Sequence, residues 1–511
     1  MPALEEPHPA AATTQAQPTA TAPRRRTALA AECTVGIVRA RLACVLLALA
    51  PACAKSEAHE TPAVQPPAPA QAPAPALASA PAPALAPAPA PAPAPASAPA
   101  LAPTPSDSCG PLRLDLPPAT TLDGFDPPLL DVDDAHGSLD RFFARTAALL
   151  RGRAKAPVRI GVYADSNGTM DFTSGEMRRA LQVSHGDAGH GFVALARPWN
   201  WYRHQYVVAD YDDKAWSAFT VTTHPTPALD PWYGQGLIVA QSKQTGARTW
   251  VQTAPDDSPI GARASGFEVW YLAWPPGGRF DVKVDGEVKA SADTHAEGDP
   301  HFGVVRVDVP DGPHKMVAVT TSPRPVRLLG AIVDRDVPGF QVDGLGVGSL
   351  NCLCVLRESE ALDHEIFAHR PYDLVVFHIG SNTWNPAVMD PVACMKESIA
   401  RLRRAVPDVS VMIMTPPDWG EGGMRKTPGW LKKVEAQLRQ SADEAPAAFF
   451  DFRSAMGGEG SMAKFLAMGL TQGDGVHFNK KGGAFVGDRV VGALARAFAA
   501  WMDKHPRAGC E

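Results

Sequence analysis

Hydrophobic and polar positions change their spacing several times from residue 137 onward. Residues 137–152 carry apolar side chains at helical spacing, residues 158–164 (VRIGVYA) form a continuous apolar run rich in β-branched side chains, and residues 173–182 return to helical spacing after a threonine cap. A short continuous run of this kind is typical of a strand that is buried on both faces. The pattern therefore predicts helix, strand and helix, as in a domain built on a parallel sheet.

Between residues 197 and 325 the pattern changes to short alternating runs. About eight such runs, each bounded by Gly, Pro, Asp or Asn, follow one another with no helical segment between them,. They read YVVADYD, WSAFTVTT, GLIVAQS, TWVQTA, GFEVWYLAW, RFDVKVDG, GVVRVDVP and HKMVAVTT. This pattern predicts a β-sandwich.

After residue 326 the alternation of helix and strand resumes. The predicted elements are strands at 372–380, 409–416 and 447–452 and helices at 390–406, 429–442 and 482–502,. We therefore predict an α/β domain with a parallel sheet, formed by residues 109–196 and 326–511 and interrupted by the sandwich at 197–325.

The first 108 residues have a different composition. Residues 1–56 contain the basic cluster Arg24, Arg25 and Arg26, and then the apolar stretch LACVLLALAPAC, which ends at Cys53. A basic segment, a short apolar segment and small residues are typical of a secretory signal, and the stretch is shorter than the roughly 20 residues of a membrane-spanning helix. We expect an exported protein, periplasmic or anchored at the outer membrane of a bacterium. Lipidation of Cys53 and simple cleavage remain equal alternatives.

Residues 57–108 form a tract rich in alanine and proline. Proline fixes φ and removes a hydrogen-bond donor, so this tract cannot build a core and is expected to be a disordered, extended spacer of about 3 Å per residue. Such a spacer would hold a folded head away from a membrane. An inert low-complexity insert is an equal alternative.

Charge and cysteine content restrict the partners. The formal net charge is −6 and charged residues make up 20% of the chain, with no basic stripe, so nucleic acid is not an expected partner,. Cys109 and Cys510 bracket the folded region and could form a disulfide in an oxidising compartment, while the pairing of Cys352, Cys354 and Cys394 is left open,. No CxxC pair or zinc-type spacing occurs, and we expect neither a metal nor a cofactor,.

Three groups of polar residues follow predicted strands or precede the last helix. Ser166 follows the strand at 158–164, Asn382 follows the strand at 372–380, and Asp474 and His477 lie in the loop before the last helix. Ligands of open parallel sheets bind beyond the carboxyl ends of the strands. Acyl transfer needs a hydroxyl nucleophile, an imidazole base and a carboxylate that orients the imidazole. We therefore predict a site with Ser166, His477 and Asp474 as catalytic residues.

These residues resemble the blocks of the SGNH (GDSL) hydrolases. The first block is similar to "ADS" with Ser166, the asparagine block to "GSN" with Asn382, and the last block to the Asp-x-x-His of Asp474 and His477. Peptidoglycan O-acetylesterases of this family carry a carbohydrate-binding-module-like β domain between the first block and the others, which matches the interruption at 197–325. The resemblance implies a flavodoxin-like parallel sheet, a jelly-roll-like insertion and a serine esterase that works through an acyl-enzyme.

The resemblance also implies an oxyanion hole. Its donors would be the Ser166 N–H, a backbone N–H at Gly348 or Ser349, and the Asn382 amide. The chain departs from the family at two of these blocks, because Ala164 stands where the family has a glycine and Ser349 replaces the second glycine of the block after the insertion. Which of Gly348 and Ser349 donates is left open.

The expected function is the removal of O-acetyl groups from a cell-envelope polysaccharide, with peptidoglycan as the first candidate. Acetylated xylan or exopolysaccharide, a broad carboxylesterase or lipase, acetyl transfer between sugars, and a catalytically degenerate glycan-binding lipoprotein are alternatives. Membrane contact is expected only through a lipid anchor, and the oligomeric state is left open. Seven of the 11 tryptophans lie in or next to the insertion, and we expect most of them to pack in cores although sugar stacking is possible for their aromatic faces,.

Overall fold

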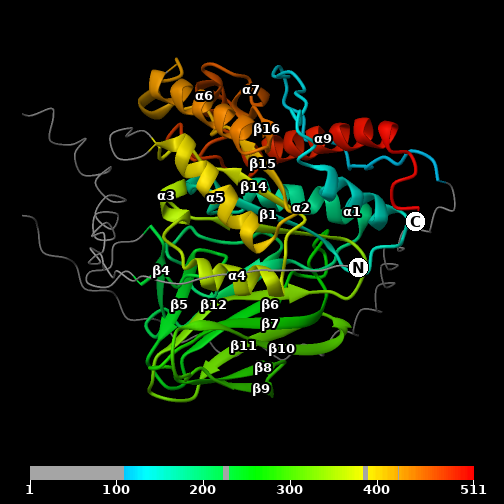
Figure 1. Ribbon diagram of the computed structural model, residues 1–511. Helices are drawn as coiled ribbons and strands as arrows, with labels where there is room; N and C mark the ends of the chain where they lie inside the picture. Colours follow the sequence, from blue (N-terminus) through cyan, green and yellow to red (C-terminus); the bar gives the residue numbers. More distant parts are fainter. Residues whose placement is uncertain (1–108, 223–229, 384–389, 424, 511) are drawn as a thin grey trace, which may run out of the picture. The chain divides into compact units, whose positions relative to one another are not determined.

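A five-stranded parallel sheet organises the α/β part of the protein (Figure 1). The computed structural model describes residues 109–222, 230–383, 390–423 and 425–510, so the predicted signal segment, Cys53 and the Ala/Pro-rich spacer lie outside the described residues. The sheet has the order β13-β1-β14-β15-β16. Its strands are β1 Val158–Ala164, β13 Phe340–Gly346, β14 Leu374–His378, β15 Ser410–Met414 and β16 Ala448–Phe450.

The order of this sheet is that of a flavodoxin-like fold. Counted along the chain without the insertion, the strands lie in the order 2-1-3-4-5. The chain passes from β1 to β13 on one side of it and then returns to β14 on its other side, so the strand order reverses at β1,. Ala164 is paired with Gly346 on one side and with His378 on the other, so three strands end at the same edge. The predicted α/β architecture is confirmed, and this edge is where such sheets bind ligands.

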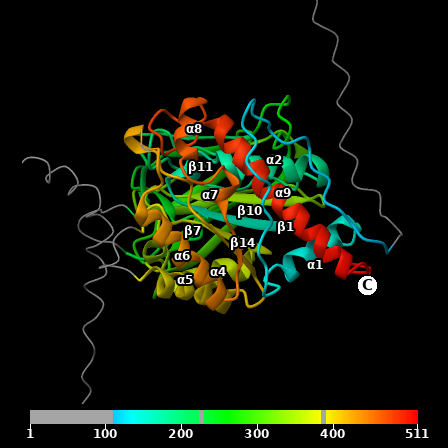
Figure 2. The same cartoon turned by 90° about the horizontal axis from the view of Figure 1, so that it is seen from above.

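Helices cover both faces of the parallel sheet. Alternate residues of β1 point to opposite faces: Ile160 and Val162 belong to a core with α1 Asp140–Leu150, α2 Phe172–His185 and α9 Lys480–Lys504,. Tyr163 belongs to a second core, which includes side chains of the remaining long helices. These are α4 Glu360–His369, α5 Pro391–Ala405 and α6 Gly429–Glu444. Figure 2 shows α9 beside α1, with which it is in contact.

Short helices connect these elements. They are α3 Cys352–Val355, α7 Phe452–Ala455, α8 Ser461–Ala467 and the 3-10 turns η3 Ser166–Gly168 and η4 Glu421–Gly423. Disulfides join Cys109 to Cys510, at the two ends of the described chain, and Cys352 in α3 to Cys394 in α5. Within the described residues, no helix combines the length and the apolar character that crossing a membrane requires.

Two antiparallel sheets form the inserted sandwich around a core of their own. One has the order β10-β7-β12-β5-β4 with β2 paired to β12, and the other has the order β3-β6-β11-β8-β9. The strands are β2 Gly191–Val193, β3 Val207–Tyr211, β4 Ser217–Thr220, β5 Ile238–Ser242, β6 Arg248–Thr253, β7 Ala264–Ala273, β8 Arg279–Val284, β9 Glu287–Asp293, β10 His301–Gly312, β11 Lys315–Thr320 and β12 Val326–Asp334.

The boundaries of the sandwich differ from the expected 197–325. Strand β12 lies inside the sandwich sheet between β7 and β5, and β2 pairs with it, so residues on both sides of the expected range belong to the sandwich. The sequence of β12 is apolar almost throughout because both of its faces are covered. Leu328 and Ala331 lie in the sandwich core, whereas Leu329 and Ile332 lie in the core shared with α4. Such a doubly covered strand has the pattern of a parallel-sheet strand.

Candidate active site

Ser166 lies in a tight turn at the carboxyl end of β1. The Asp165 carboxylate accepts a hydrogen bond from the Asn167 N–H (3.2 Å) and so begins the 3-10 turn η3. The Thr169 hydroxyl donates to the Ser166 carbonyl (2.8 Å) and closes it. Burial raises the pKa of Asp165, against hydrogen bonds from the Asn167 N–H and from Ser381. The turn holds the Ser166 backbone on both sides while its side chain stays partly exposed.

Ala164 is compatible with this turn although the related family has a glycine there. Ala164 is a strand residue and does not adopt a positive φ. A β-carbon added to Gly168 would lie 2.5 Å from the Ala164 β-carbon and 3.0 Å from Gly346 Cα. The methyl group of Ala164 therefore fits because residue 168 has no side chain, and the backbone conformation at Ala164 does not require glycine.

His477 and Asp474 meet Ser166 from the loop before α9. The Nε2 atom of His477 lies 2.8 Å from the Ser166 Oγ, and its Nδ1 atom lies 2.6 Å from Asp474 Oδ2. The other oxygen of Asp474 accepts the backbone N–H groups of Val476 and His477, each at 2.9 Å. With the ring proton on Nδ1, Nε2 is free to accept the Ser166 proton. The structure thus brings Ser166 together with His477, which is 311 positions away in sequence, and with Asp474, which precedes His477 by three residues.

The charge on Asp474 is stabilised locally. Burial raises the pKa of this carboxyl, but hydrogen bonds from the His477 N–H, the His477 ring and the Val476 N–H outweigh it and hold the pKa below its usual range. An ionised carboxylate stabilises the imidazolium that forms when His477 takes a proton. The loop thus favours the ionised form of Asp474, which is the form that supports His477 as a general base.

Asn167 joins the two halves of the site, and the sequence analysis did not identify it. Its amide nitrogen donates to the Val476 carbonyl (3.2 Å), and its side-chain oxygen accepts the Phe478 N–H (3.1 Å). These two bonds flank His477, and Asn167 is 7% exposed. The buried side chain directly after the nucleophile therefore holds the histidine loop. The only sequence signal is its position next to Ser166, which by itself suggests no more than a turn residue.

The residues expected at the oxyanion hole gather at the neighbouring strand ends. Gly348 and Ser349 are the central residues of a turn closed by the Leu350 N–H on the Val347 carbonyl (3.1 Å). Asn382, after β14, donates its amide to the Leu350 carbonyl (3.4 Å). The structure therefore places the Asn382 amide at this turn.

Ser349 adopts the left-handed backbone that favours glycine, with φ at 63°. This conformation costs a residue with a side chain about 1 kcal/mol or more. Gly348 is restricted by packing instead, because a β-carbon there would lie 2.9 Å from Trp199 Cζ2. The replacement of glycine by Ser349 thus leaves the turn in place at an energetic cost.

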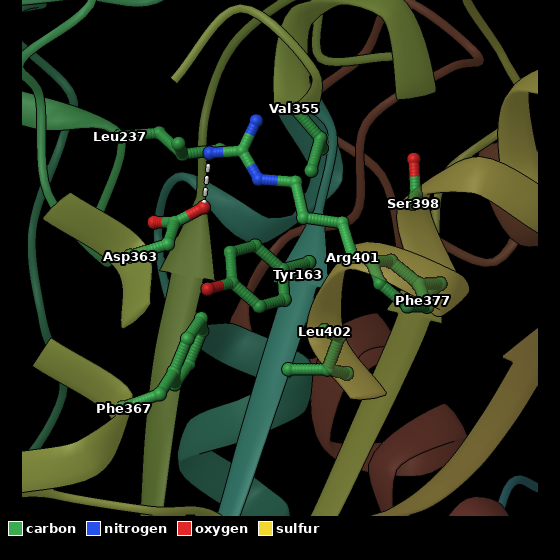
Figure 3. A pocket seen from close by; sticks show the side chains of 9 residues that line it. All are labelled: Tyr163, Leu237, Val355, Asp363, Phe367, Phe377, Ser398, Arg401 and Leu402. Carbon is green, nitrogen blue, oxygen red and sulfur yellow. Dashed lines mark hydrogen bonds and ion pairs between the residues drawn. The ribbon is translucent and has the colours of Figure 1, made fainter. Parts of the chain in front are cut away.

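The cavity in Figure 3 is separate from these residues. It lies between the sheet and helices α4 and α5, and the Arg401 guanidinium in it pairs with Asp363. Its volume is about 20 Å³, which is room for about one water molecule,. The lining residues are Tyr163, Leu237, Val355, Asp363, Phe367, Phe377, Ser398, Arg401 and Leu402, and none of the proposed catalytic residues is among them.

Asp171, His190 and His204 form a buried group whose ligand atoms lie within 4.8 Å of one another. The carboxylate is already occupied: Arg178 donates to both of its oxygens (2.7 and 3.3 Å), and the Gln205 N–H donates to one (2.9 Å). Burial lowers the pKa of both histidines, that of His204 to about 4. The Arg178 guanidinium already compensates the charge of the one carboxylate in this group, so the group does not fit a metal ion,.

Comparison with known proteins gives a family match over part of the chain and a shared fold. Residues 312–485 match the model of the GDSL-like lipase/acylhydrolase family. A solved peptidoglycan O-acetylesterase is 20% identical, with a TM-score of 0.58, and the alignment covers 72% of this chain and 99% of that one. A protein from Bacillus subtilis (14% identity, TM-score 0.27, 57% and 90% covered) and a family two carbohydrate esterase from Clostridium thermocellum (10%, 0.25, 57% and 98%) are also similar.

The comparison with curated proteins returns no similar sequence. The family match and the structural match confirm the expected resemblance and the expected class of ester hydrolase. At 20% identity the structural match establishes a shared fold.

Proposed function

We propose that this SGNH/GDSL-type ester hydrolase removes O-acetyl groups from a cell-envelope polysaccharide, with Ser166 as nucleophile, His477 as base and Asp474 as its orienting carboxylate. The observation that carries the proposal is the continuous pair of hydrogen bonds from Ser166 Oγ to His477 Nε2 and from His477 Nδ1 to Asp474 Oδ2, at the carboxyl edge of the sheet. These contacts have the distances required for proton transfer from a hydroxyl nucleophile.

The reaction would proceed in two steps. Ser166 Oγ attacks the acetyl carbonyl while its proton passes to His477 Nε2, and the oxyanion is bound by the Ser166 N–H, a backbone N–H at Gly348 or Ser349, and the Asn382 amide. The C–O bond to the sugar breaks as His477 returns the proton to the sugar oxygen. Water then attacks the acetyl-serine with His477 again as base, and acetate and free Ser166 are released.

Peptidoglycan is the first candidate substrate. The support is the shared fold with a peptidoglycan O-acetylesterase and the β-sandwich inserted after the first block. The alternatives are acetylated xylan as the substrate and a broad carboxylesterase activity.

Export through the segment that ends at Cys53 is part of the proposal, and mass analysis of the mature N-terminus would check it. The complete hydrogen-bonded set of Ser166, His477 and Asp474 argues against the alternative of a glycan-binding protein without catalysis.

Ser166→Ala tests the reaction. We expect kcat for p-nitrophenyl acetate to fall by at least about 10³-fold, because the hydroxyl that forms the acyl-enzyme is removed. Ser184→Ala, on the exposed surface of α2, is the matched control and should keep wild-type turnover. Undiminished turnover in Ser166→Ala would reject the assignment.

Acetate release from O-acetylated peptidoglycan, compared with release from acetylated xylan, tests the substrate. A preference for longer acyl chains over acetyl would indicate a lipase instead.

A further inference from the structure

One exposed aromatic side chain stands out near the candidate active site. Among the described residues, the large hydrophobic side chains that are markedly exposed are those of Leu129, Val183, Trp201, Val208 and Val288, and Trp201 is the aromatic one, at 51%. Other tryptophans of the region, such as Trp216 (3%) and Trp270 (0%), are buried as expected. An indole left half in water keeps part of its aromatic surface available for contact with a ligand.

Trp199 holds Trp201 in place. The two rings stack at 16° with their centroids 6.3 Å apart, and Trp199 is itself partly buried against the core of the α/β domain. A turn closed by the Tyr202 N–H on the Trp199 carbonyl (3.0 Å) fixes the backbone between them. The part of the Trp201 side chain that its neighbours leave uncovered is exposed to solvent. The pair therefore presents a rigid aromatic surface whose ordering is not paid for on binding.

The segment that carries this pair contacts the oxyanion turn and the turn that holds the nucleophile. Trp199 lies against Gly348, where a β-carbon would come within 2.9 Å of its ring. The Arg203 N–H, two residues after Trp201, donates to the Thr169 carbonyl (3.1 Å), and the Thr169 hydroxyl donates to the Ser166 carbonyl (2.8 Å). The tryptophans belong to the segment that leads from β2 into β3, so the insertion contributes this surface to the edge of the sheet.

We propose that Trp201, supported by Trp199, is a glycan subsite on which a pyranose ring of the O-acetylated polysaccharide stacks. The C–H face of a pyranose is apolar and matches an exposed indole face, while its hydroxyl and acetyl groups project from the ring edge. A ring held here would present an ester on its edge to Ser166. The inference rests on the proposed function, since it names how the substrate of that same site is held.

Trp250 is the alternative aromatic surface, on strand β6 of the sandwich. Its ring is already covered by the Lys315 ammonium, which lies 4.8 Å from the ring centroid. It therefore offers less free aromatic face than Trp201, and it provides a matched tryptophan control away from the site.

The test measures binding without turnover. In full-length protein carrying Ser166→Ala, we expect Trp201→Ala to weaken calorimetric binding of solubilised O-acetylated peptidoglycan by about tenfold or more, because the stacking surface is lost. Trp201→Phe should recover most of the affinity, and Trp250→Ala should bind like the parent. In proteins that retain Ser166, Trp201→Ala should lower kcat/KM for the glycan several-fold more than for p-nitrophenyl acetate.

Parental affinity in Trp201→Ala would overturn the subsite, as would an equal loss in Trp250→Ala, which would indicate binding by the sandwich. Equal loss on the glycan and on p-nitrophenyl acetate would indicate damage to the catalytic residues and would also overturn it. If Trp201→Ala weakens binding while the wild-type protein releases no acetate, the subsite stands and the proposed reaction fails.

Discussion

Asn167 connects the nucleophile turn to the histidine loop through two hydrogen bonds on either side of His477. Ser166 and His477 belong to segments far apart in sequence, so the 2.8 Å contact between them depends on such a link. A shift of about 1 Å at a reacting group can lower a rate by about a hundredfold. Asn167 therefore acts through His477 as a positioning residue.

Asn167→Asp tests this role. The carboxylate still accepts the Phe478 N–H but cannot donate to the Val476 carbonyl, so we expect kcat for p-nitrophenyl acetate to fall about 10- to 100-fold with KM changed less than about threefold. Stopped-flow kinetics and the melting temperature of the same preparation check it. A fall in stability with kcat unchanged would show a structural role alone.

At the scale of elements, α2 and α9 approach closely and enclose carboxyl groups. A β-carbon on Gly487 of α9 would lie 2.8 Å from Glu176 Cβ of α2. Glu176 accepts a hydrogen bond from Arg179 (2.8 Å) and also faces Asp488. Burial raises the pKa of Glu176 from 4.5 to about 7, with the Asp488 charge adding to the effect and Arg179 opposing it.

This pKa makes stability depend on pH. Between pH 4.5 and about 7 the folded protein keeps a proton on Glu176 that the unfolded chain has released, so the free energy of unfolding decreases as pH rises through that range,. Glutamine cannot release a proton, so the free energy of unfolding of Glu176→Gln should fall less between pH 5 and pH 8 than that of the wild type. We expect the difference to be ~1–2 kcal/mol, allowing for partial solvent screening. Urea denaturation at both pH values measures it. The exposed Glu421→Gln is the control, and parallel curves for wild type and Glu176→Gln would contradict the assignment.

At the scale of the molecule, the sandwich is fixed to the α/β domain by buried contacts. Glu358, just before α4, accepts the N–H groups of Tyr233 (2.8 Å) and Gly234 (2.9 Å) from the insertion. At the other end of α4, His369 lies 2.9 Å from Glu268 of β7. The two domains also share one hydrophobic core.

Glu358→Ala should destabilise the protein by about 2–4 kcal/mol, because two backbone N–H groups lose their acceptor in a buried place. Glu360→Ala removes a surface ion pair with Arg404 and should cost under about 1 kcal/mol,. Chemical denaturation of both variants compares them. Equal effects of the two substitutions would mean that the Glu358 contacts contribute no more than a surface pair.

Local pattern determined much of this protein from the sequence alone. The strands at 158–164 and 372–380 follow from continuous apolar runs, because a strand covered on both faces must be apolar throughout,. The long helices follow from apolar side chains at helical spacing. The Asp-x-x-His spacing likewise places Asp474 and His477 on one loop, since three residues fit a single turn. Ser166 and these two could be selected because each stands at the end of such an element.

Tertiary structure decided what depends on distant neighbours. The apolar strand β12 could belong to either domain, and only its packing between the two cores shows that it lies in the sandwich. The compatibility of Ala164 with the nucleophile turn depends on Gly168. The hydrogen bonds of Asn167 and the stacking of Trp201 on Trp199 likewise join groups whose contacts have no periodic signature along the chain. The spacing of residues along the sequence determines on which face of a helix or strand a side chain lies. The residue that it contacts there depends on how the layers of the structure pack against one another.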